Sequence, residues 1–468
     1  MLTYYNSKAT RLRYAAPHTL LGVGGVASAL LGLLLFVFGW VVFQIPANYF
    51  ISPAVLAGLA CNLVEAGSCL IAFACLLFLG AGILYKFTPD NEKIRHMVYR
   101  GFCCPAYGNP LHLKDGEFLP KVSCVPSNSG RYTVTVTGAS VATEEIMKSA
   151  SRISSLINGK YQRYAVIYVN EPPDCHSVEF CVEDVMQDYS LTFKSAGEMR
   201  NYDLTKLLLQ NGTAIDLTSS GSMLIAGKTR SGKTTGIISL LLQVLQQGRD
   251  DYGSEVIIID PKQAELSRLS HVITLDKDGK ARGILNALWQ YDDETITVRQ
   301  QDLNDLSEQC GDAVHWWDAG MHPSFLFIDE YVALRSLFPK KPPKEDPDYC
   351  LATFDDLIKR IVTMGASAGC YVIISIAQAS VDEGGLPSML RSAMSTKILF
   401  RPTLEEGRLM WPGPDLETLA IARRYVPGDA WFSSTDGEHD APSYVHFPHM
   451  KFAVYRELGR LLREYYGD

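Results

Sequence analysis

Two long stretches near the start of the chain contain almost no charged residues. Residues 20–43 carry none, and residues 55–85 carry only Glu65. At roughly 1.5 Å per residue, a helix of about 24 residues covers the ~30 Å hydrocarbon core of a membrane. A short segment with two prolines separates the stretches. The sequence therefore predicts a hairpin of two membrane-spanning helices over residues 20–85.

Basic residues flank this predicted hairpin at one end only, because the segment between the two stretches contains no Lys or Arg. The flanking cations are Lys8, Arg11, Arg13, Lys86, Lys93, Arg95 and Arg100. Loops that stay in the cytoplasm are enriched in Lys and Arg, so we expect a multi-pass protein of the cell membrane with residues 1–19 and the main body in the cytoplasm. A cleaved signal peptide is the competing interpretation, but a second apolar stretch follows closely.

The overall charge limits the kind of surface that the protein can present. A formal net charge of -8 argues against a surface that binds nucleic acid everywhere, although basic residues can still line a narrow pore. The 11 cysteines include no Cys-x-x-Cys pair. We therefore expect reduced thiols in a cytoplasmic body rather than disulfides or a structural metal site.

A connector and a small domain are predicted after the hairpin. Residues 86–130 are rich in Pro, Gly and Cys without a sustained period, as is typical of a linker. Residues 131–211 begin with an alternating, β-branched strand at 131–137, which a short amphipathic helix and two further strands follow. No residue pattern in this segment indicates chemistry. We expect a small α/β adaptor domain.

A phosphate-binding loop marks the start of the third predicted region. From residue 212 onward, short apolar strands alternate with helices, as in a parallel sheet that is buried on both faces. The strand at 222–226 leads directly into a match to G-x-x-x-x-G-K-[ST] and then into an apolar helix, which is the order that this motif requires. The residues expected to bind nucleotide are Gly227, Lys228, Thr229, Arg230, Ser231, Gly232, Lys233, Thr234 and Thr235.

Each type of residue in this loop has a physical role. Gly227 and Gly232 allow backbone N–H groups to turn toward phosphate. Lys233 supplies a cation to the β- and γ-phosphates, and the Thr234 hydroxyl holds Mg²⁺ at the start of the helix. The expected cofactors are therefore ATP and Mg²⁺.

A second motif supplies carboxylates. The apolar strand 325–328 ends in Asp329 and Glu330. Asp329 is suited to organise Mg²⁺, and Glu330 to orient the attacking water. Two further apolar strands end in polar residues, one in Asp260-Pro261-Lys262 and the other in Gln378. Because open α/β sheets build their sites at the carboxyl ends of strands, Gln378 is a candidate sensor of the γ-phosphate, or simply a hydrogen-bonded loop residue.

Taken together, these motifs resemble the FtsK/SpoIIIE (HerA-related) DNA translocase family, in particular the FtsK-like coupling ATPases of Gram-positive conjugative elements. The resemblance covers most of residues 212–432 and includes Asp260-Pro261-Lys262, Ala368-Gly369 and Pro427-Gly428-Asp429. It implies a RecA-like ATPase domain over 212–450, followed by a single helix over 451–468. It also implies a homo-hexameric ring around double-stranded DNA, with ATP bound between subunits.

The sequence departs from the family pattern at three places. Arg230 stands where many members have Gly, and the segment before Ala368-Gly369 lacks the Arg that often acts on the neighbouring subunit's ATP. Arg360 or Arg391 could replace that arginine finger. The family's winged-helix domain is also missing after the last helix, so we expect a role other than chromosome segregation.

A proline-containing loop after the Asp329-Glu330 strand carries three lysines, Lys340, Lys341 and Lys344. These are candidate contacts to the DNA phosphate backbone, although a solvated surface loop would have a similar composition. The function expected from the resemblance is ATP-dependent translocation of double-stranded DNA at the cell membrane, with a relaxase and transfer-channel proteins as possible partners. The alternatives are a membrane ATPase of a protein secretion system and a nucleotide-gated membrane scaffold that translocates nothing.

Overall fold

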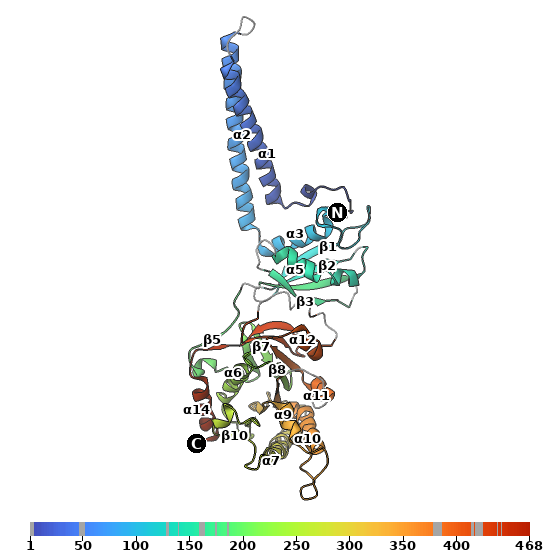
Figure 1. The fold of residues 1–468 in the computed structure, drawn as a ribbon, viewed down its shortest axis with the longest axis vertical. Coiled ribbons are helices and arrows are strands. Elements are labelled where there is room, and N and C mark those ends of the chain that lie inside the picture. Colours follow the sequence, from blue (N-terminus) through green and yellow to red (C-terminus); the bar gives the residue numbers. More distant parts are fainter. Residues whose placement is uncertain are drawn as a thin grey trace. The chain divides into compact units, whose positions relative to one another are not determined.

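The computed structural model describes residues 4–45, 52–127, 131–138, 140–158, 164–173, 176–184, 187–377, 386–412, 416, 425–437, 439–440 and 442–468. It contains two compact units, Met1–Asp184 and Val185–Asp468, which are described separately (Figure 1).

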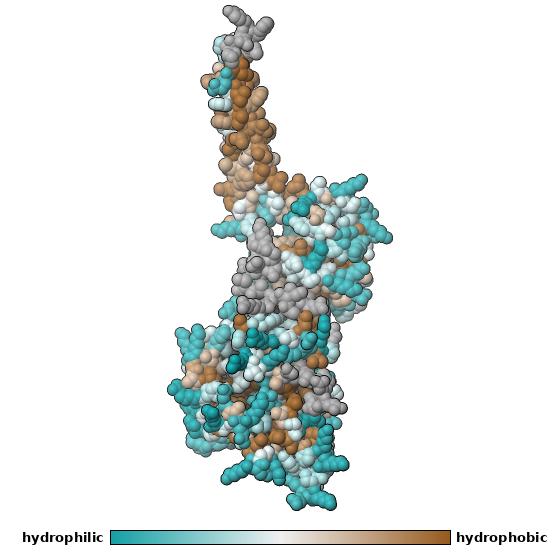
Figure 2. All heavy atoms as spheres, in the orientation of Figure 1, coloured by the Kyte–Doolittle hydropathy of each residue, from teal (hydrophilic) through white to brown (hydrophobic). Residues whose placement is uncertain are grey.

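The first unit begins with the predicted hairpin, formed by α1 (Pro17–Gln44) and α2 (Pro53–Phe87). Both helices are long and apolar enough to cross a membrane, as judged by length and composition. Large side chains such as Leu34 and Phe43 are exposed on the outside of the pair, and Figure 2 shows this surface as an apolar region along the hairpin. The two predicted apolar helices are confirmed.

Small residues at seven-residue intervals bring the two helices together. The buried positions include Gly25, Gly32, Gly39, Ala60, Gly67 and Ala74. A Cβ atom on Gly32 would lie only 2.8 Å from the backbone oxygen of Gly67, so the backbones meet too closely for a larger residue. Because lipid offers no hydrophobic driving force between helices, such close packing is what holds a helix pair together in a membrane.

The rest of the first unit is a four-stranded antiparallel sheet with helices packed against it. The strands are β1 (Lys121–Pro126), β2 (Arg131–Thr137), β3 (Tyr164–Asn170) and β4 (Ser177–Asp184), in the order β1-β2-β4-β3. The helices are η1 (Arg11–Tyr14), α3 (Asp90–Cys103), η2 (Pro105–Tyr107), α4 (Thr143–Met147) and α5 (Ala150–Asn158). Residues of α3, α5 and all four strands form one apolar core.

The structure differs from the connector expected over 86–130, because this segment forms α3 and β1 and belongs to the core of the first unit. Ile94, Val98 and Phe102 recur every four residues on α3 and are fully buried. The Pro and Gly residues that suggested a linker gather mainly between these two elements. The composition of residues 86–130 as a whole is therefore typical of a linker, although its first part has the spacing of an amphipathic helix.

The second unit is built on an eight-stranded sheet. Its strands are β8 (Met223–Gly227), β9 (Val256–Ile259), β10 (Val272–Ile273), β11 (Ser324–Ile328), β12 (Cys370–Ile376), β13 (Thr396–Phe400), β14 (Asp429–Ser433) and β15 (Ser443–His446). The order is β10-β9-β11-β12-β8-β13-β14-β15, with parallel pairing up to β13 and antiparallel pairing for the last two strands. The predicted α/β fold with a mostly parallel sheet is confirmed.

Helices cover both faces of this sheet, which is why its strands are continuously apolar. Phe325, Phe327, Tyr371 and Ile373 join the core that includes α6 (Lys233–Leu245) and α14 (Val454–Tyr466). Residues that alternate with these on β11 and β12 point to the opposite face, because side chains alternate along a strand. Further helices are α7 (Arg282–Gln290), η5 (Tyr291–Ile296), α8 (Thr297–Cys310), α9 (Tyr331–Ser336), α10 (Leu351–Met364), η6 (Gly365–Ala368), α11 (Ser388–Ala393) and α12 (Leu404–Met410).

A small hairpin of β6 (Lys206–Gln210) and β7 (Thr213–Asp216) packs against α6. The Gln243 side chain on α6 accepts a hydrogen bond from Leu208 N (2.7 Å) and donates one to Leu208 O (3.0 Å). Residues 187–211 therefore lie in the second unit, although the sequence analysis expected them in the adaptor domain.

Candidate nucleotide-binding site

The phosphate-binding loop joins the carboxyl end of β8 to the start of α6. Gly232 has φ of +95°, and a Cβ atom there would lie 2.5 Å from Gly428 N, so glycine is required on both grounds. Gly428 N donates a hydrogen bond to Ser231 O at 3.0 Å. The segment that leads into β14 therefore braces the loop from one side.

Lys233 lies inside the site rather than in solvent. Its ammonium donates a hydrogen bond to Ile376 O at the end of β12 (3.2 Å) and lies 3.3 Å from Glu330 Oε1. β8 and β12 are neighbours in the sheet, so the start of α6 is placed beside the end of β12. The side chain is buried and held between a carboxylate and a carbonyl, as a cation that binds phosphate oxygens would be.

Glu330 binds two lysines at once. The Lys262 ammonium lies 2.8 Å from the same Oε1 atom that Lys233 contacts. Burial by itself would raise the pKa of Glu330, but the hydrogen bond from Lys262 and the charges of Lys233 and Lys262 bring this pKa below its ordinary value. Glu330 also has a left-handed backbone, with φ of +47°, which is uncommon for a non-glycine residue and is found at functional sites.

Asp329 is the more deeply buried of the two carboxylates. Its Oδ1 atom accepts hydrogen bonds from Ser375 Oγ on β12 (2.8 Å) and from Glu330 N (3.1 Å). Burial raises the pKa of Asp329 above its ordinary value. A carboxylate in such surroundings gains stability from a cation at the same site.

Asp260 holds the loop that carries Lys262. This fully buried carboxylate accepts hydrogen bonds from the backbone N–H groups of Lys262 (3.1 Å), Ala264 (3.0 Å) and Ser267 (3.1 Å). Lys262 and Ser375 were not among the site residues predicted from the sequence. The position of Asp260-Pro261-Lys262 at the end of a strand was the available signal for Lys262, whereas Ser375 lies inside an apolar strand and gave none.

The other predicted site residues lie at different distances from this centre. Lys228, Thr229 and Arg230 in the loop and Thr235 in the first turn of α6 are exposed. Lys228 Nζ lies 3.8 Å from Glu406 Oε1 on α12. Thr234 is half-buried in the first turn of α6. Gln378 lies outside the described residues.

Neither candidate arginine finger joins the site of its own chain. Arg360 Nε lies 2.9 Å from Asp292 Oδ2, and Arg391 Nη1 donates to Leu409 O at 3.1 Å. Within the described ranges, no hydrogen bond or ion pair connects either arginine to residues 227–235.

The loop with the three lysines is anchored at its base. Phe338 stacks on Phe354 with ring centroids 4.4 Å apart, and Leu351 N donates to Pro339 O at 2.9 Å. Lys340, Lys341 and Lys344 are all exposed beyond this base. In Figure 1 the loop is drawn in orange and extends away from α7 and α10.

The site has features that fit Mg²⁺ and a phosphate chain. The Ser231 hydroxyl is buried and has no hydrogen-bond partner among the described residues, so a ligand oxygen would satisfy it. The described residues contain no cluster of three or more His, Cys, Asp or Glu side chains that could hold a metal alone. A cation here would therefore need ligand oxygens in addition to Asp329 and Thr234.

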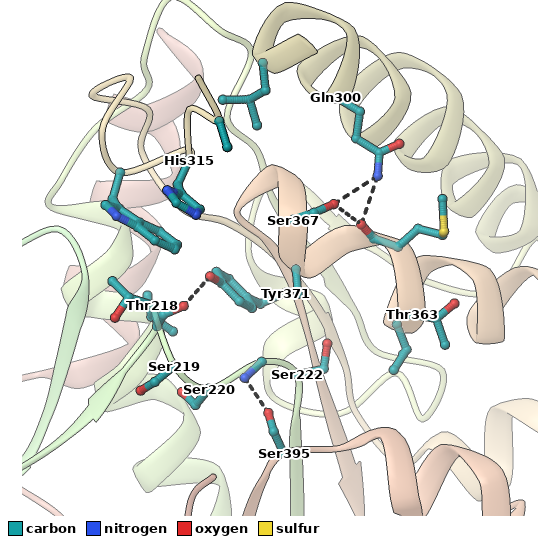
Figure 3. A pocket seen from close by; sticks show the side chains of 18 of the residues that line it. Thr218, Ser219, Ser220, Ser222, Gln300, His315, Thr363, Ser367, Tyr371 and Ser395 are labelled. Atoms are coloured by element: carbon teal, nitrogen blue, oxygen red, sulfur yellow. Dashed lines mark hydrogen bonds between the residues drawn. The ribbon is translucent and has the colours of Figure 1, made fainter. Parts of the chain in front are cut away.

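A cavity lies at the opposite edge of the sheet, where the strands begin (Figure 3). It has a volume of about 930 Å³, and its walls include Ser222, Tyr371 and Ser395 at the amino ends of β8, β12 and β13. The described residues that line it include no Asp, Glu, Lys or Arg. The charged groups that phosphate chemistry needs lie at the other edge and do not line this cavity.

Two curated proteins match the sequence over substantial lengths. The "Ftsk domain-containing protein YdcQ" of Bacillus subtilis (strain 168) is 30% identical over 153 residues, which cover 32% of this chain and 28% of that protein. "DNA translocase FtsK" of Clostridium acetobutylicum is 24% identical over 319 residues, which cover 63% of this chain and 38% of that protein. The chain resembles the FtsK-type DNA translocases. The resemblance predicted from the motifs is confirmed, and the chain spans well under two thirds of each of these two relatives.

No family model matches the chain. Among solved structures, the conjugation coupling protein TcpA of pCW3, in a monomer form with ATPγS, gives a TM-score of 0.45 at 12% identity over 80% of this chain and 99% of that one. EssC, ATPases 2 and 3, from Geobacillus thermodenitrificans gives a TM-score of 0.41 at 16% identity over 60% and 52%.

Proposed function

We propose that this protein is a membrane-anchored ATPase that translocates double-stranded DNA, and that it serves as a coupling protein in the conjugative transfer of a mobile element. The observation that carries the proposal is that Lys233, Asp329 and Glu330 lie together at the carboxyl ends of the sheet strands. The resemblance of the chain to FtsK-type translocases supports the same proposal. The two apolar helices would place this motor at the cytoplasmic face of the cell membrane.

Mg²⁺ and ATP, when bound, would supply the phosphoanhydride bond and the cation that neutralises its oxygens. The Thr234 hydroxyl and Asp329 are the groups that would hold Mg²⁺. Lys233 would exchange its contacts with Glu330 and Ile376 for phosphate oxygens. Lys262 would then remain as the cation on Glu330 and keep its carboxylate in place.

Glu330 is the group best placed to orient water. Both lysines contact its Oε1 atom, which leaves Oε2 to accept a hydrogen bond from the attacking water. The left-handed backbone of Glu330 sets where its side chain leaves the chain, and the ion pair with Lys262 holds the carboxylate in that position. A fixed acceptor raises the rate because water does not have to be reoriented during the reaction.

A hexamer would complete the site. Among the described residues, neither Arg360 nor Arg391 contacts the phosphate-binding loop of its own chain, so we propose that an arginine finger comes from a neighbouring copy. The exposed lysines at 340, 341 and 344 would contact DNA phosphates in the pore. A relaxase and transfer-channel proteins are the partners that a coupling protein of this kind would need.

The test is ATP turnover by the full-length protein in detergent, with and without double-stranded DNA, followed by displacement of a triplex-forming strand from that DNA. We expect DNA to stimulate turnover and the wild type, but not Glu330→Gln, to displace the third strand. ATP turnover that DNA leaves unchanged would instead favour a protein-secretion ATPase. ATP binding without turnover would favour a scaffold that translocates nothing.

A further inference from the structure

A second cavity lies in the first unit, at the end of the hairpin where the basic residues are found. Its volume is about 490 Å³, and its walls come from the start of α1, the end of α2 and one face of α3. This size is within the range of pockets that enclose small ligands or head groups. Nothing in the ATPase site involves these residues.

The lining contains both apolar and basic side chains. Leu84, Met97 and Leu156 supply apolar surface. The lining includes three residues with basic side chains of the Lys or Arg type, Lys93, Arg95 and Arg100, and one carboxylate, Glu92. Such a wall suits a ligand that has both an apolar part and a negatively charged part.

Two of these cations already have carboxylate partners. Lys93 Nζ lies 3.1 Å from Asp90 Oδ1, and Arg95 Nη2 lies 2.6 Å from Glu92 Oε2. Arg100 differs, because it donates to the Tyr107 hydroxyl (2.8 Å) and its buried Nε atom has no hydrogen-bond partner in the described part of the chain. This N–H group is free to bind an anion.

Two more arginines meet at Tyr107. The Arg11 guanidinium lies 5.6 Å from the centre of the Tyr107 ring, the Arg100 guanidinium 5.4 Å from it, and Arg152 donates to the Tyr107 backbone oxygen. Across the described ranges, none of the three guanidinium groups pairs with a carboxylate. The start of α1, which has no side-chain cap, adds the positive end of its helix dipole. The excess positive charge here calls for a negatively charged ligand.

We propose that this cavity binds the head group of an anionic phospholipid from the cytoplasmic leaflet. The proposal rests on the membrane anchoring given under the proposed function. Guanidinium groups bind phosphate well, and anionic lipids are concentrated on the cytoplasmic side, to which the positions of the flanking cations assign this end of the hairpin. The phosphate would lie near Arg100 and the glycerol near Leu84 and Met97.

The experiment places the full-length protein in nanodiscs of phosphatidylcholine alone or of phosphatidylcholine mixed with phosphatidylglycerol, and counts retained lipids by native mass spectrometry after partial delipidation. We expect phosphatidylglycerol to be retained preferentially. Arg100→Gln should lower this preference by about five-fold, since one basic residue near an anionic surface contributes about that factor. Arg100→Lys should keep part of it.

Lys86→Gln is the matched control, because Lys86 is in the last turn of α2 but does not line the cavity. It should leave the preference unchanged, and a loss equal to that of Arg100→Gln would show diffuse surface charge instead of a site. Equal retention of both lipids would overturn the proposal. Displacement of phosphatidylglycerol by millimolar inorganic phosphate would assign the cavity to a soluble phosphate compound and overturn the lipid assignment.

Membrane anchoring is measured in a separate experiment, as the fraction of the protein that stays with membranes after an alkaline wash. A chain that is washed out would overturn the anchoring itself. A chain that stays in the membrane but shows no lipid preference would overturn only the lipid site.

Discussion

The two edges of the eight-stranded sheet, one where the strands begin and one where they end, differ in charge. The carboxyl edge gathers Lys233, Lys262, Asp329 and Glu330 within hydrogen-bonding distance of one another or of a shared partner. The amino edge has a cavity of about 930 Å³, and the described residues that line it include no Asp, Glu, Lys or Arg. Because open α/β sheets build their sites at the carboxyl ends of strands, the charged edge is the candidate phosphate site even though a cavity of this size lies at the other edge.

The largest difference between the edges is expected for Lys233→Ala. This change removes the buried cation that would bind phosphate, so steady-state ATP hydrolysis by the full-length protein should fall by about a hundredfold or more. Thr363→Ala, in the wall of the amino-edge cavity, is the control and should hydrolyse ATP at the wild-type rate. Equal losses from both changes would remove the distinction between the edges.

Glu330→Gln separates binding from hydrolysis at the carboxyl edge. The change keeps the shape of the side chain but removes the charge that holds two lysines and orients water. We expect turnover to be abolished while ATP binding, measured by filter retention, persists. Turnover at the wild-type rate would exclude Glu330 from the mechanism.

Arg360 and Arg391 test whether the amino edge of one chain serves the carboxyl edge of another. Arg360 lies one turn before cavity-lining residues of α10, and Arg391 lies just before Ala393, which lines the same cavity. The Ala variant of the true finger should bind ATP normally but hydrolyse it poorly. Mixing it with Lys233→Ala should restore part of the activity at hybrid interfaces. If mixing restores activity to neither arginine variant, the amino edge of a neighbouring chain does not supply the arginine finger.

Lys262→Met measures the contribution of the lysine that the sequence motifs did not reveal as part of the site. Removal of a charged hydrogen bond to Glu330 should lower turnover by about tenfold. Lys262→Arg should retain more activity, because the cation is kept. Lys277→Met, an exposed lysine of the same unit, should have no effect. Unchanged hydrolysis in Lys262→Met would mean that Lys233 alone holds the carboxylate.

The smallest effect on hydrolysis is expected from the loop between α9 and α10. Replacing Lys340, Lys341 and Lys344 by Ala should leave basal turnover intact and weaken binding to all DNA sequences about equally. In a salt titration the slope of log K should shrink by up to ~0.9 for each phosphate that the loop no longer neutralises. Changing Lys194, Lys277 and Lys280 to Ala, three exposed lysines elsewhere on this unit, controls for the change in net charge. An unchanged slope would place the loop outside the DNA path.

The sequence was sufficient where function depends on a short local pattern. The glycines, Lys233 and the Asp329-Glu330 pair lie in motifs whose strand, loop and helix follow one another along the chain. The contact between Lys262 and Glu330 could not be predicted from such local patterns. The contact requires β9 and β11 to be neighbours in the sheet, with Ile259 opposite Ile328. Pairing between distant strands leaves no mark on either strand alone.

The same limit applies to the first unit. The amphipathic spacing of Ile94, Val98 and Phe102 was present in the sequence, but its partners on the sheet come from later segments. The left-handed backbone of Glu330 also follows from tertiary packing, since nothing in the residue type requires it. The two long apolar helices were simpler to predict, because they depend only on the length of an uncharged stretch.

The seven-residue spacing of small residues in the hairpin has a consequence for assembly. Gly32, Gly39 and Gly67 are already used in holding α1 to α2, and the surface left facing outward consists of bulky side chains such as Leu34 and Phe43. In the proposed membrane-anchored form, each copy would bring an already packed helix pair into the bilayer, with an outer surface that is mostly apolar and that also exposes Asn62 and Glu65. In a ring of such copies, subunits could be replaced one at a time without separating any closely packed helices within the lipid.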